Sequence, residues 1–464
     1  MSAVAEIVSL NPADPTDEVL RVRPAGGIEA EQAVEQAARV ARAWAAAPAL
    51  ARGEVLRQAA ERLDGRSQEA ADLIRREVGK PITEARGEVA RSVAILRFYA
   101  QVALDPDGET FPSGDGRSLL MTRRAPRGVV GLITPWNFPL AIPLWKLAPA
   151  LVYGNACVLK PSPFAPAGAE LIGELFAGLL PEGVLGIVHG EGDVGAVLVA
   201  HPAVAAVSFT GSERVGRSVA TELARRGAAA QCEMGGQNAA IVLADADLEA
   251  AAAIIAGAAM GYAGQKCTAT RRVICERPVL GEMREALVAA VERLVVVDPS
   301  DDACAVGPLI APEARDRVIA AIGRARDAGG RLLCGGAALD AAGWYVQPTL
   351  IELDDPAAEL AQEEVFGPVS AVLTAADAGA AAELARGVRQ GLSSGIYTRD
   401  LDRALELTRT LDTGLVRVNQ PTAGVDFHVP FGGEKSSGYG PREQGRAARD
   451  FYTSLRTVLV SPSC

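Results

Sequence analysis

The sequence predicts an α/β protein built from two consecutive α/β units that follow a helical N-terminal segment. Residues 29–103 show a helical pattern, and short apolar runs then alternate with helical stretches in two sets, the second starting near residue 238. Such alternation indicates parallel sheets covered by helices on both faces. At 464 residues the chain exceeds what one hydrophobic core usually serves, so we expect two or three tightly docked domains.

The helical segment spaces its apolar residues three and four apart between charged ones, as in IEAEQAVEQAARVARAWAAA and ITEARGEVARSVAILRFYAQVA. A turn-rich stretch, 105–118, follows, and LLMTRRAPRGVVGLITP reads as extended strand. The first alternating set then predicts strands at GVVGLITP, ACVLKPS, LGIVHG and AAVSFTGS, and helices over 140–153, 165–180, 192–200 and 213–227.

The second alternating set predicts strands at NAAIVLADAD, RRVICER, VSAVLTA and GLVRVN, and helices over 250–263, 279–293, 312–328 and 377–389. The tail DFYTSLRTVLV ends on alternating apolar residues and reads as a strand that needs a partner. Segment 117–125 is the candidate partner strand, in the same chain or in another subunit. Pairing between subunits is included because an unpaired edge strand favours association.

Composition narrows the class of partner. The formal net charge of −11 and the pI near 5.1 argue against nucleic acid or an anionic membrane, since both require a basic face. The Ala-rich run 250–263 is too short to span a bilayer. Seven scattered cysteines without a CxxC, and a start without a basic region before an apolar run, indicate a reduced, cytoplasmic protein. We expect a small-molecule ligand and no metal site.

Lysine is rare in this chain. Only five of the 46 basic residues are lysine, so a lysine marks a position where an arginine was not acceptable or survives by chance. An ammonium is a compact point charge, whereas a guanidinium is planar and forked. Lys160 and Lys266 are therefore candidate functional residues.

Two glycine turns could hold a phosphate. Residues 190–195 contain a GxGxxG match, which is weak by itself because the dinucleotide fingerprint also needs a tight strand-to-helix turn early in a βαβ unit. In SFTGSERVG, Ser212 could cap the next helix and leave free N–H groups for a phosphate. An ordinary helix cap is the alternative.

Four polar side chains stand at positions suited to chemistry. Asn137 lies between prolines in ITPWNFP, so its amide is aimed as an oxyanion hole requires, although asparagine is also common in plain turns. Glu233 ends an apolar strand, where desolvation would raise its pKa toward the range of a general base. Glu364, beside a Gly-Pro turn, could bind ribose hydroxyls, and Cys267 is the candidate nucleophile.

The motifs PWNFP, VLKPS, FTGS, EMGG, GQKC, EEVFGPV and PFGGEKSSG, in this order, resemble the aldehyde dehydrogenase superfamily over nearly the whole chain. The resemblance implies a Rossmann-type NAD(P)-binding domain of residues 1–107 and 127–235 and a second α/β catalytic domain of residues 236–435. It also implies a small β oligomerisation extension of residues 108–126 and 436–464, in a homodimer or homotetramer.

By this resemblance, Cys267 attacks the aldehyde to form a thiohemiacetal, hydride leaves for the nicotinamide, and a thioester remains. Asn137 and the backbone N–H of Cys267 would hold the oxyanion, and Glu233 would activate the water that hydrolyses the thioester. The residues implied to bind the cofactor are Ile133, Thr134, Pro135, Trp136, Lys160, Ser162, Pro163, Gly192, Phe209, Thr210, Gly211, Ser212, Val215, Met234, Gly235, Glu364 and Phe366.

One departure concerns the choice of cofactor. Many NAD-preferring members of the family carry a glutamate three residues after the strand lysine, whereas this sequence has Pro163 there. A carboxylate at this position would repel the 2′-phosphate of NADP. Because it is missing, the sequence predicts use of NADP as well as NAD.

The substrate is the least determined feature. AGQKCTAT and YGPREQG resemble the branch that oxidises 2,5-dioxopentanoate, a semialdehyde, and Arg271 could pair with its carboxylate or have a structural role. Phe138, Trp145 and Phe427 would line the aldehyde tunnel by family position, which equally suits an aromatic or aliphatic apolar aldehyde. A CoA-acylating enzyme and a non-catalytic homologue are the rival functions; Glu233 opposes the first, and the presence of Cys267, Glu233 and Asn137 opposes the second.

Overall fold

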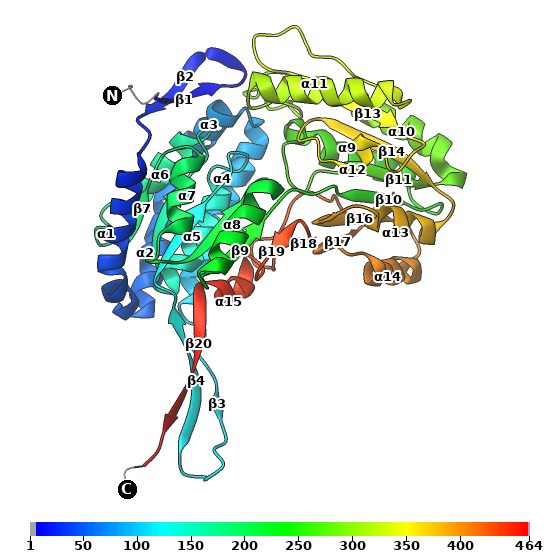
Figure 1. Ribbon diagram of the computed structural model, residues 1–464. Helices are drawn as coiled ribbons and strands as arrows, with labels where there is room; N and C mark the ends of the chain where they lie inside the picture. Colours follow the sequence, from blue (N-terminus) through cyan, green and yellow to red (C-terminus); the bar gives the residue numbers. More distant parts are fainter. Residues whose placement is uncertain (1–5, 463–464) are drawn as a thin grey trace.

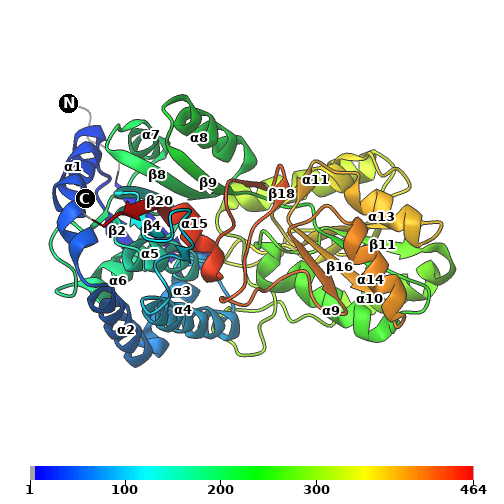
Figure 2. The same cartoon turned by 90° about the horizontal axis from the view of Figure 1, so that it is seen from below.

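The computed structural model describes residues 6–462, so Cys464 lies outside the described residues. Two helix-covered sheets lie side by side, and a narrow β arm projects from the first of them (Figures 1 and 2). The predicted α/β class with two units and a small β extension is confirmed.

The first sheet has six strands. The edge strand β19 is antiparallel to its neighbour, and the other five strands are parallel to one another. The order in the sheet is β19 (Gly438–Tyr439), β9 (Ala229–Glu233), β8 (Val204–Thr210), β5 (Val129–Ile133), β6 (Ala156–Lys160) and β7 (Leu185–Ile187). After β5 the chain builds β6 and β7 on one side and returns to the other side with β8. Open parallel sheets bind ligands at the carboxyl ends of strands where the order reverses in this way. The loops that follow β5 and β8 are therefore the expected binding edge.

Helices cover both faces of this sheet. One face packs against α1 (Gly27–Ala46), α7 (Gly192–Ala200) and α8 (Glu213–Arg225). The other packs against α5 (Ala141–Val152) and α6 (Pro166–Phe176), behind which lie α2 (Ala49–Gly65), α3 (Ser67–Val78) and α4 (Ile82–Val102). A hairpin of β1 (Ile7–Asn11) and β2 (Asp14–Val22) precedes them and was not predicted, because half of β2 is exposed and its sequence is largely polar.

The second sheet has seven strands, and only its first edge strand is antiparallel to its neighbour. The order is β12 (Arg331–Cys334), β13 (Thr349–Glu352), β14 (Val369–Ala375), β11 (Arg272–Glu276), β10 (Ala239–Val242), β16 (Ser393–Tyr397) and β17 (Leu415–Val418). The helices of this unit are α9 (Leu248–Met260), α10 (Leu280–Glu292), α11 (Pro312–Asp327), α12 (Glu359–Gln362), α13 (Ala378–Arg386) and α14 (Leu401–Thr410).

The arm consists of β3 (Thr110–Phe111), β4 (Leu119–Pro126) and β20 (Thr453–Val460). β20 pairs with β4 along its whole length, so the predicted partner of the tail is confirmed, and it lies in the same chain. The predicted extension of 436–464 was too long: β19 joins the first sheet, and α15 (Ala448–Tyr452) packs on α5 with Phe451 and Tyr452 buried. Hydrophobic burial holds that stretch in the first unit.

A short ladder of β15 (Gln390–Gly391) and β18 (Glu434–Lys435) lies between the two units. In the described part of the chain, no helix combines the length and apolarity needed to cross a bilayer. Nor do residues 6–462 gather three or more potential metal ligands at one point.

Candidate active site

Cys267 lies in the loop between the 3-10 helix η1 (Gly261–Gly264) and the amino end of β11. The cavity that its thiol lines is also lined by Asn137, which follows β5, and by Gly235, which follows β9. Cys267 of the second unit therefore faces the binding edge of the first sheet, and the site is built where the two units meet.

The backbone ahead of the thiol has an uncommon shape. Tyr262, Ala263 and Gly264 have φ values of 56°, 51° and 65°, three successive residues in the left-handed region. Left-handed non-glycine residues cost on the order of 1–3 kcal/mol each and persist only where their surroundings hold them. Here the buried Tyr262 hydroxyl donates to the carbonyl of Val78 at 3.2 Å, which ties the loop to α3.

Arg271 holds the same loop from behind. Its guanidinium is buried and donates to the carbonyls of Gly367 at 2.8 Å, Gly264 at 2.6 Å and Lys266 at 3.4 Å. The alternative that Arg271 pairs with a substrate carboxylate was wrong, because these bonds turn the side chain toward backbone carbonyls and away from the pocket in front of Cys267. Its role is structural: leaving a buried acceptor unpaired costs about 1–3 kcal/mol.

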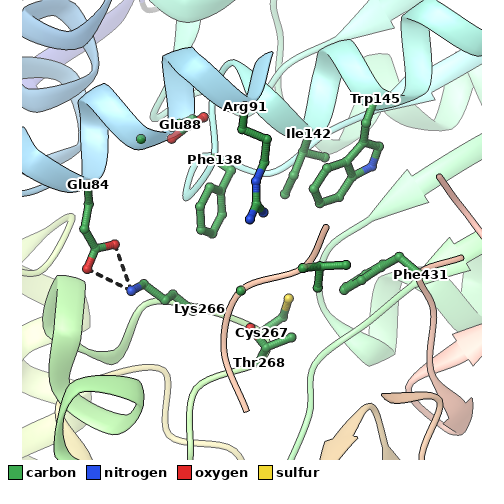
Figure 3. A pocket seen from close by; sticks show the side chains of 13 residues that line it. Glu84, Glu88, Arg91, Phe138, Ile142, Trp145, Lys266, Cys267, Thr268 and Phe431 are labelled. Carbon is green, nitrogen blue, oxygen red and sulfur yellow. Dashed lines mark hydrogen bonds and ion pairs between the residues drawn. The ribbon is translucent and has the colours of Figure 1, made fainter. Parts of the chain in front are cut away.

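Cys267 lines two cavities. The first, here called the aromatic pocket, contains Phe138, Trp145 and Phe431 in its wall (Figure 3). The second, here called the loop pocket, lies against the loops after β5, β8 and β9. Cys267 thus borders both cavities, so a ligand in each would lie against the same residue.

The thiol of Cys267 favours its protonated form at neutral pH. Burial, and then the carboxylates of Glu364 and Glu233, raise its pKa to about 12. Because the thiolate is the nucleophilic form, the site needs a group that removes the proton or stabilises the anion when the ligands are in place.

Asn137 is buried beside the thiol. Its Nδ2 donates to the carbonyl of Gln265 at 2.9 Å, and Gln265 is itself fixed by Nε2 donating to the carbonyl of Pro308 and by Oε1 accepting from the N–H of Ile310. The amide is therefore held in one orientation, and its second N–H remains for a ligand in the loop pocket that it shares with Cys267.

Glu233 is buried where β9 ends. Its carboxylate accepts from the N–H of Gly433 at 3.0 Å, and burial, followed by the charge of Glu443, raises its pKa well above the ordinary value. This direction is the predicted one. Glu443 was not predicted: it is buried, accepts from Trp145 Nε1 at 2.8 Å and forms an ion pair with Lys146.

The predicted cofactor residues fall mainly into two adjoining cavities. The loop pocket is lined by Pro135, Trp136, Thr210, Gly211, Ser212, Met234, Gly235, Glu364 and Phe366. A third cavity is lined by Ile133, Lys160, Gly192, Phe209 and Val215. Thr134, Ser162 and Pro163 line neither of these two cavities.

The shape of the loop pocket fits a ligand with hydrogen-bonding groups. A Cβ on Gly235 would lie 1.9 Å from Glu364 Oε2, and a Cβ on Gly211 would lie 2.5 Å from the ring of Phe209, so a larger residue at either position would displace a side chain that lines these cavities. Among the described residues that line the loop pocket, Thr210 has a buried hydroxyl without a hydrogen-bond partner. A buried hydroxyl without a partner at this cavity is a group that a bound ligand would satisfy.

Lys160 and Ser212 differ in how well they meet the prediction. Lys160 is buried at the end of β6, its Nζ donates to the carbonyl of Pro161 at 3.0 Å, and burial lowers its pKa to about 8. Ser212 is the N-cap residue of α8, but its side chain makes no capping hydrogen bond. The first N–H groups of α8 are consequently left for a ligand.

Two of the predicted substrate residues, Phe138 and Trp145, line the aromatic pocket. Phe427 does not: its ring packs edge-on against Phe98, with centroids 5.8 Å apart, and Phe431 takes the place in the wall. The family position was a few residues off: Val425 and Phe431, on either side of Phe427 in the sequence, line the pocket, whereas the Phe427 ring packs on α4.

Several wall residues carried no signal in the sequence. Arg91 comes from the middle of α4 and enters the aromatic pocket, but it is one of 41 arginines and sits in an unremarkable helical pattern. Lys266, which lysine scarcity did single out, lies at the pocket and pairs with Glu84 at 2.8 Å.

Comparison with known proteins places the chain in a family. The profile described as "Aldehyde dehydrogenase family" matches residues 1–458. Alpha-ketoglutaric semialdehyde dehydrogenase of Bacillus subtilis is 41% identical over 97% of this chain and 94% of its own. Benzaldehyde dehydrogenase [NAD(+)] of Pseudomonas putida is 37% identical over 94% and 89%, and betaine aldehyde dehydrogenase 2 of Rhizobium meliloti is 38% identical over 98% and 94%.

Solved structures agree. An NAD-dependent aldehyde dehydrogenase from Sinorhizobium meliloti superposes with a TM-score of 0.96 at 32% identity, covering 100% of this chain and 93% of that one. PnpE from Pseudomonas sp. WBC-3, in complex with nicotinamide adenine dinucleotide, gives 0.94 at 35% identity, covering 100% and 96%. The chain belongs to the aldehyde dehydrogenase family and is an oxidoreductase that acts on aldehydes.

Proposed function

We propose that this protein oxidises an aldehyde to the carboxylic acid with NAD or NADP, through a thiohemiacetal and a thioester on Cys267. The observation that carries this proposal is that Cys267 lines both the aromatic pocket and the loop pocket. An aldehyde in the first and a nicotinamide in the second would meet at the sulfur, with Asn137 beside it.

Each residue has a separate part in the proposed reaction. The Cys267 thiolate attacks the carbonyl carbon, while the Asn137 amide and the Cys267 backbone N–H stabilise the oxyanion. When bound, the nicotinamide would supply the hydride acceptor, and Glu364, which lines the loop pocket, would hold its ribose. Glu233 then takes a proton from the water that attacks the thioester, a role to which its raised pKa is suited.

The proposed cofactor range is broad. Pro163 supplies no carboxylate that would repel a 2′-phosphate. Glu191 and Asp193 act electrostatically on the Lys160 ammonium, so some negative charge remains near the cavity that Lys160 lines. A hydrogen bond to a charged group contributes about 1.5–3 kcal/mol. Without a carboxylate at position 163, a roughly 10- to 100-fold preference for NAD over NADP is lost. We therefore propose that both cofactors are used.

The proposed substrate is a semialdehyde such as 2,5-dioxopentanoate. The B. subtilis relative named for α-ketoglutaric semialdehyde supports it, whereas the relatives named for benzaldehyde and betaine aldehyde keep an apolar or cationic aldehyde as the alternative. Aromatic side chains in the pocket wall suit an apolar aldehyde as well.

One panel tests the substrate, the cofactor and the acylating alternative. The intact enzyme is assayed without CoA on 2,5-dioxopentanoate, succinic semialdehyde and benzaldehyde, each with NAD and with NADP. We expect full turnover, the highest kcat/KM on a semialdehyde, and kcat/KM values for the two cofactors within about tenfold of each other. A requirement for CoA would contradict the hydrolytic reaction, and a preference for NAD above a hundredfold would contradict the broad cofactor range.

We also propose that the arm joins this chain to further copies as a homodimer or homotetramer. The arm projects from the body (Figure 1), and three apolar side chains of β20 are at least half exposed on it: Leu455, Leu459 and Val460. Apolar side chains exposed on a sheet edge favour association. Light scattering should give a mass of at least two chains, and Leu455→Asp with Leu459→Asp should lower it; a monomer in the unaltered protein would contradict the proposal.

A further inference from the structure

Arg91 brings a positive charge into the aromatic pocket. It lies in the middle of α4, and its side chain points from that helix into the cavity beside Phe138, toward the side where Cys267 lies (Figure 3). Within residues 6–462 its guanidinium has neither a hydrogen bond nor an ion-pair partner. By contrast, Arg86 and Arg97 of the same helix pair with Asp302 and Asp64.

The other charged groups in the pocket wall are already matched. Glu84 pairs with Lys266 at 2.8 Å, as the dashed lines in Figure 3 mark. Glu88 forms a buried ion pair with Lys80, and its other oxygen accepts from two N–H groups at the start of α5, both at 3.0 Å. The positive charge of Arg91 is therefore the unmatched charge of this described wall.

The environment of Arg91 makes an anion favourable there. Burial lowers the pKa of its guanidinium, and the charges of Glu88 and of the nearby Asp426 oppose this without bonding to it. A partly buried guanidinium without a partner is unfavourable, and a carboxylate offers it two parallel charge-assisted hydrogen bonds. A quaternary ammonium in the same place would be repelled.

We propose that Arg91 binds the carboxylate of the aldehyde substrate and thereby selects carboxylate-bearing aldehydes over neutral and cationic ones. This inference rests on the proposed function, in which the aromatic pocket receives the aldehyde. It assigns to Arg91 the part that the sequence had offered to Arg271, whose guanidinium is occupied by backbone carbonyls.

The test compares charged and neutral aldehydes of equal length on Arg91→Met, which keeps an unbranched apolar stem and removes the guanidinium and its charge. For succinic semialdehyde and 2,5-dioxopentanoate we expect kcat/KM to fall about 10- to 100-fold, mainly through KM. For butanal and pentanal we expect less than about a threefold change, because neither bears the carboxylate that Arg91 would bind. Arg97→Met, an exposed arginine of the same helix, is the matched control and should change neither.

Two further measurements keep the test decisive. Arg91→Lys keeps the charge but loses the forked geometry, so it should recover part of the lost kcat/KM for the semialdehydes and can be assayed if Arg91→Met does not fold. In the unaltered enzyme, glutarate should compete with the aldehyde more strongly than neutral glutaramide, and Arg91→Lys should weaken that difference.

The outcomes separate the two proposals. Suppose that the unaltered enzyme oxidises semialdehydes, but Arg91→Met lowers kcat/KM equally for charged and neutral aldehydes or for neither. The role of Arg91 is then overturned while the proposed function stands. If the unaltered enzyme oxidises butanal and benzaldehyde but no semialdehyde, the substrate proposal and the role of Arg91 both fall. Equal inhibition by glutarate and glutaramide likewise overturns the role of Arg91.

Discussion

Cys267→Ala is expected to lower the steady-state rate of aldehyde oxidation by at least about a thousandfold, because no other group in the site can form the thioester. Cofactor binding, followed by calorimetry, should change little, since the thiol lies at the shared wall and the loop pocket keeps its other lining residues. Formation of reduced cofactor, measured by absorbance, is the readout.

Cys334→Ala is the matched control. Cys334 is also partly buried, but it lies in β12 at the far edge of the second sheet, and its replacement should leave the rate unchanged. Alkylation adds a pH test: because the pKa of the Cys267 thiol is raised to about 12, its modification by iodoacetamide should accelerate about tenfold per pH unit between pH 7 and 9. Appreciable turnover by Cys267→Ala would remove this residue from its proposed role.

Glu233→Gln should separate the two halves of the reaction. Glutamine keeps the shape but cannot take a proton from water, so we expect the steady-state rate to fall about 10²- to 10⁴-fold while a first burst of reduced cofactor persists. Stopped-flow absorbance measures both. Glu434→Gln, an exposed glutamate paired with Arg442, is the control and should keep both the burst and the steady rate.

The pH profile gives an independent check on Glu233. The base is the carboxylate form, and burial together with Glu443 raises the pKa of Glu233. Hydrolysis in the unaltered enzyme should therefore increase as the pH rises through this raised pKa, and glutamine should abolish that increase. If the burst disappears together with the steady rate, Glu233 acts before the thioester forms and its assignment to hydrolysis is wrong.

Much of the fold followed from local pattern. β5, β6 and β8 are largely apolar runs bounded by turns; β5 and β6 lie within the predicted segments, and β8 begins one residue before its own. β16 was not predicted, because its sequence, SSGIY, contains two serines and a glycine, although all five residues are buried. Burial there comes from neighbours on both sides in the sheet, β10 and β17, and a sequence window does not contain them.

The site shows the same division. Cys267, Asn137 and Glu233 were predicted from short motifs, and the structure brings Cys267 and Asn137 to one cavity, while the roles of all three stay predictions. The sequence left Arg271 between a substrate carboxylate and a structural role; β11 begins at the next residue, and the guanidinium donates to backbone carbonyls of the loop. Arg91 could not be found, since only the packing of α4 against the second unit brings it to the pocket.

The position of Cys267 in a wall shared by two cavities has a kinetic consequence. An acyl group attached to the sulfur would occupy the aromatic side, leaving the opposite side free for one dinucleotide to depart and another to enter. In the proposed reaction, the reduced nucleotide would therefore leave through its own cavity while the acyl group is still attached to Cys267.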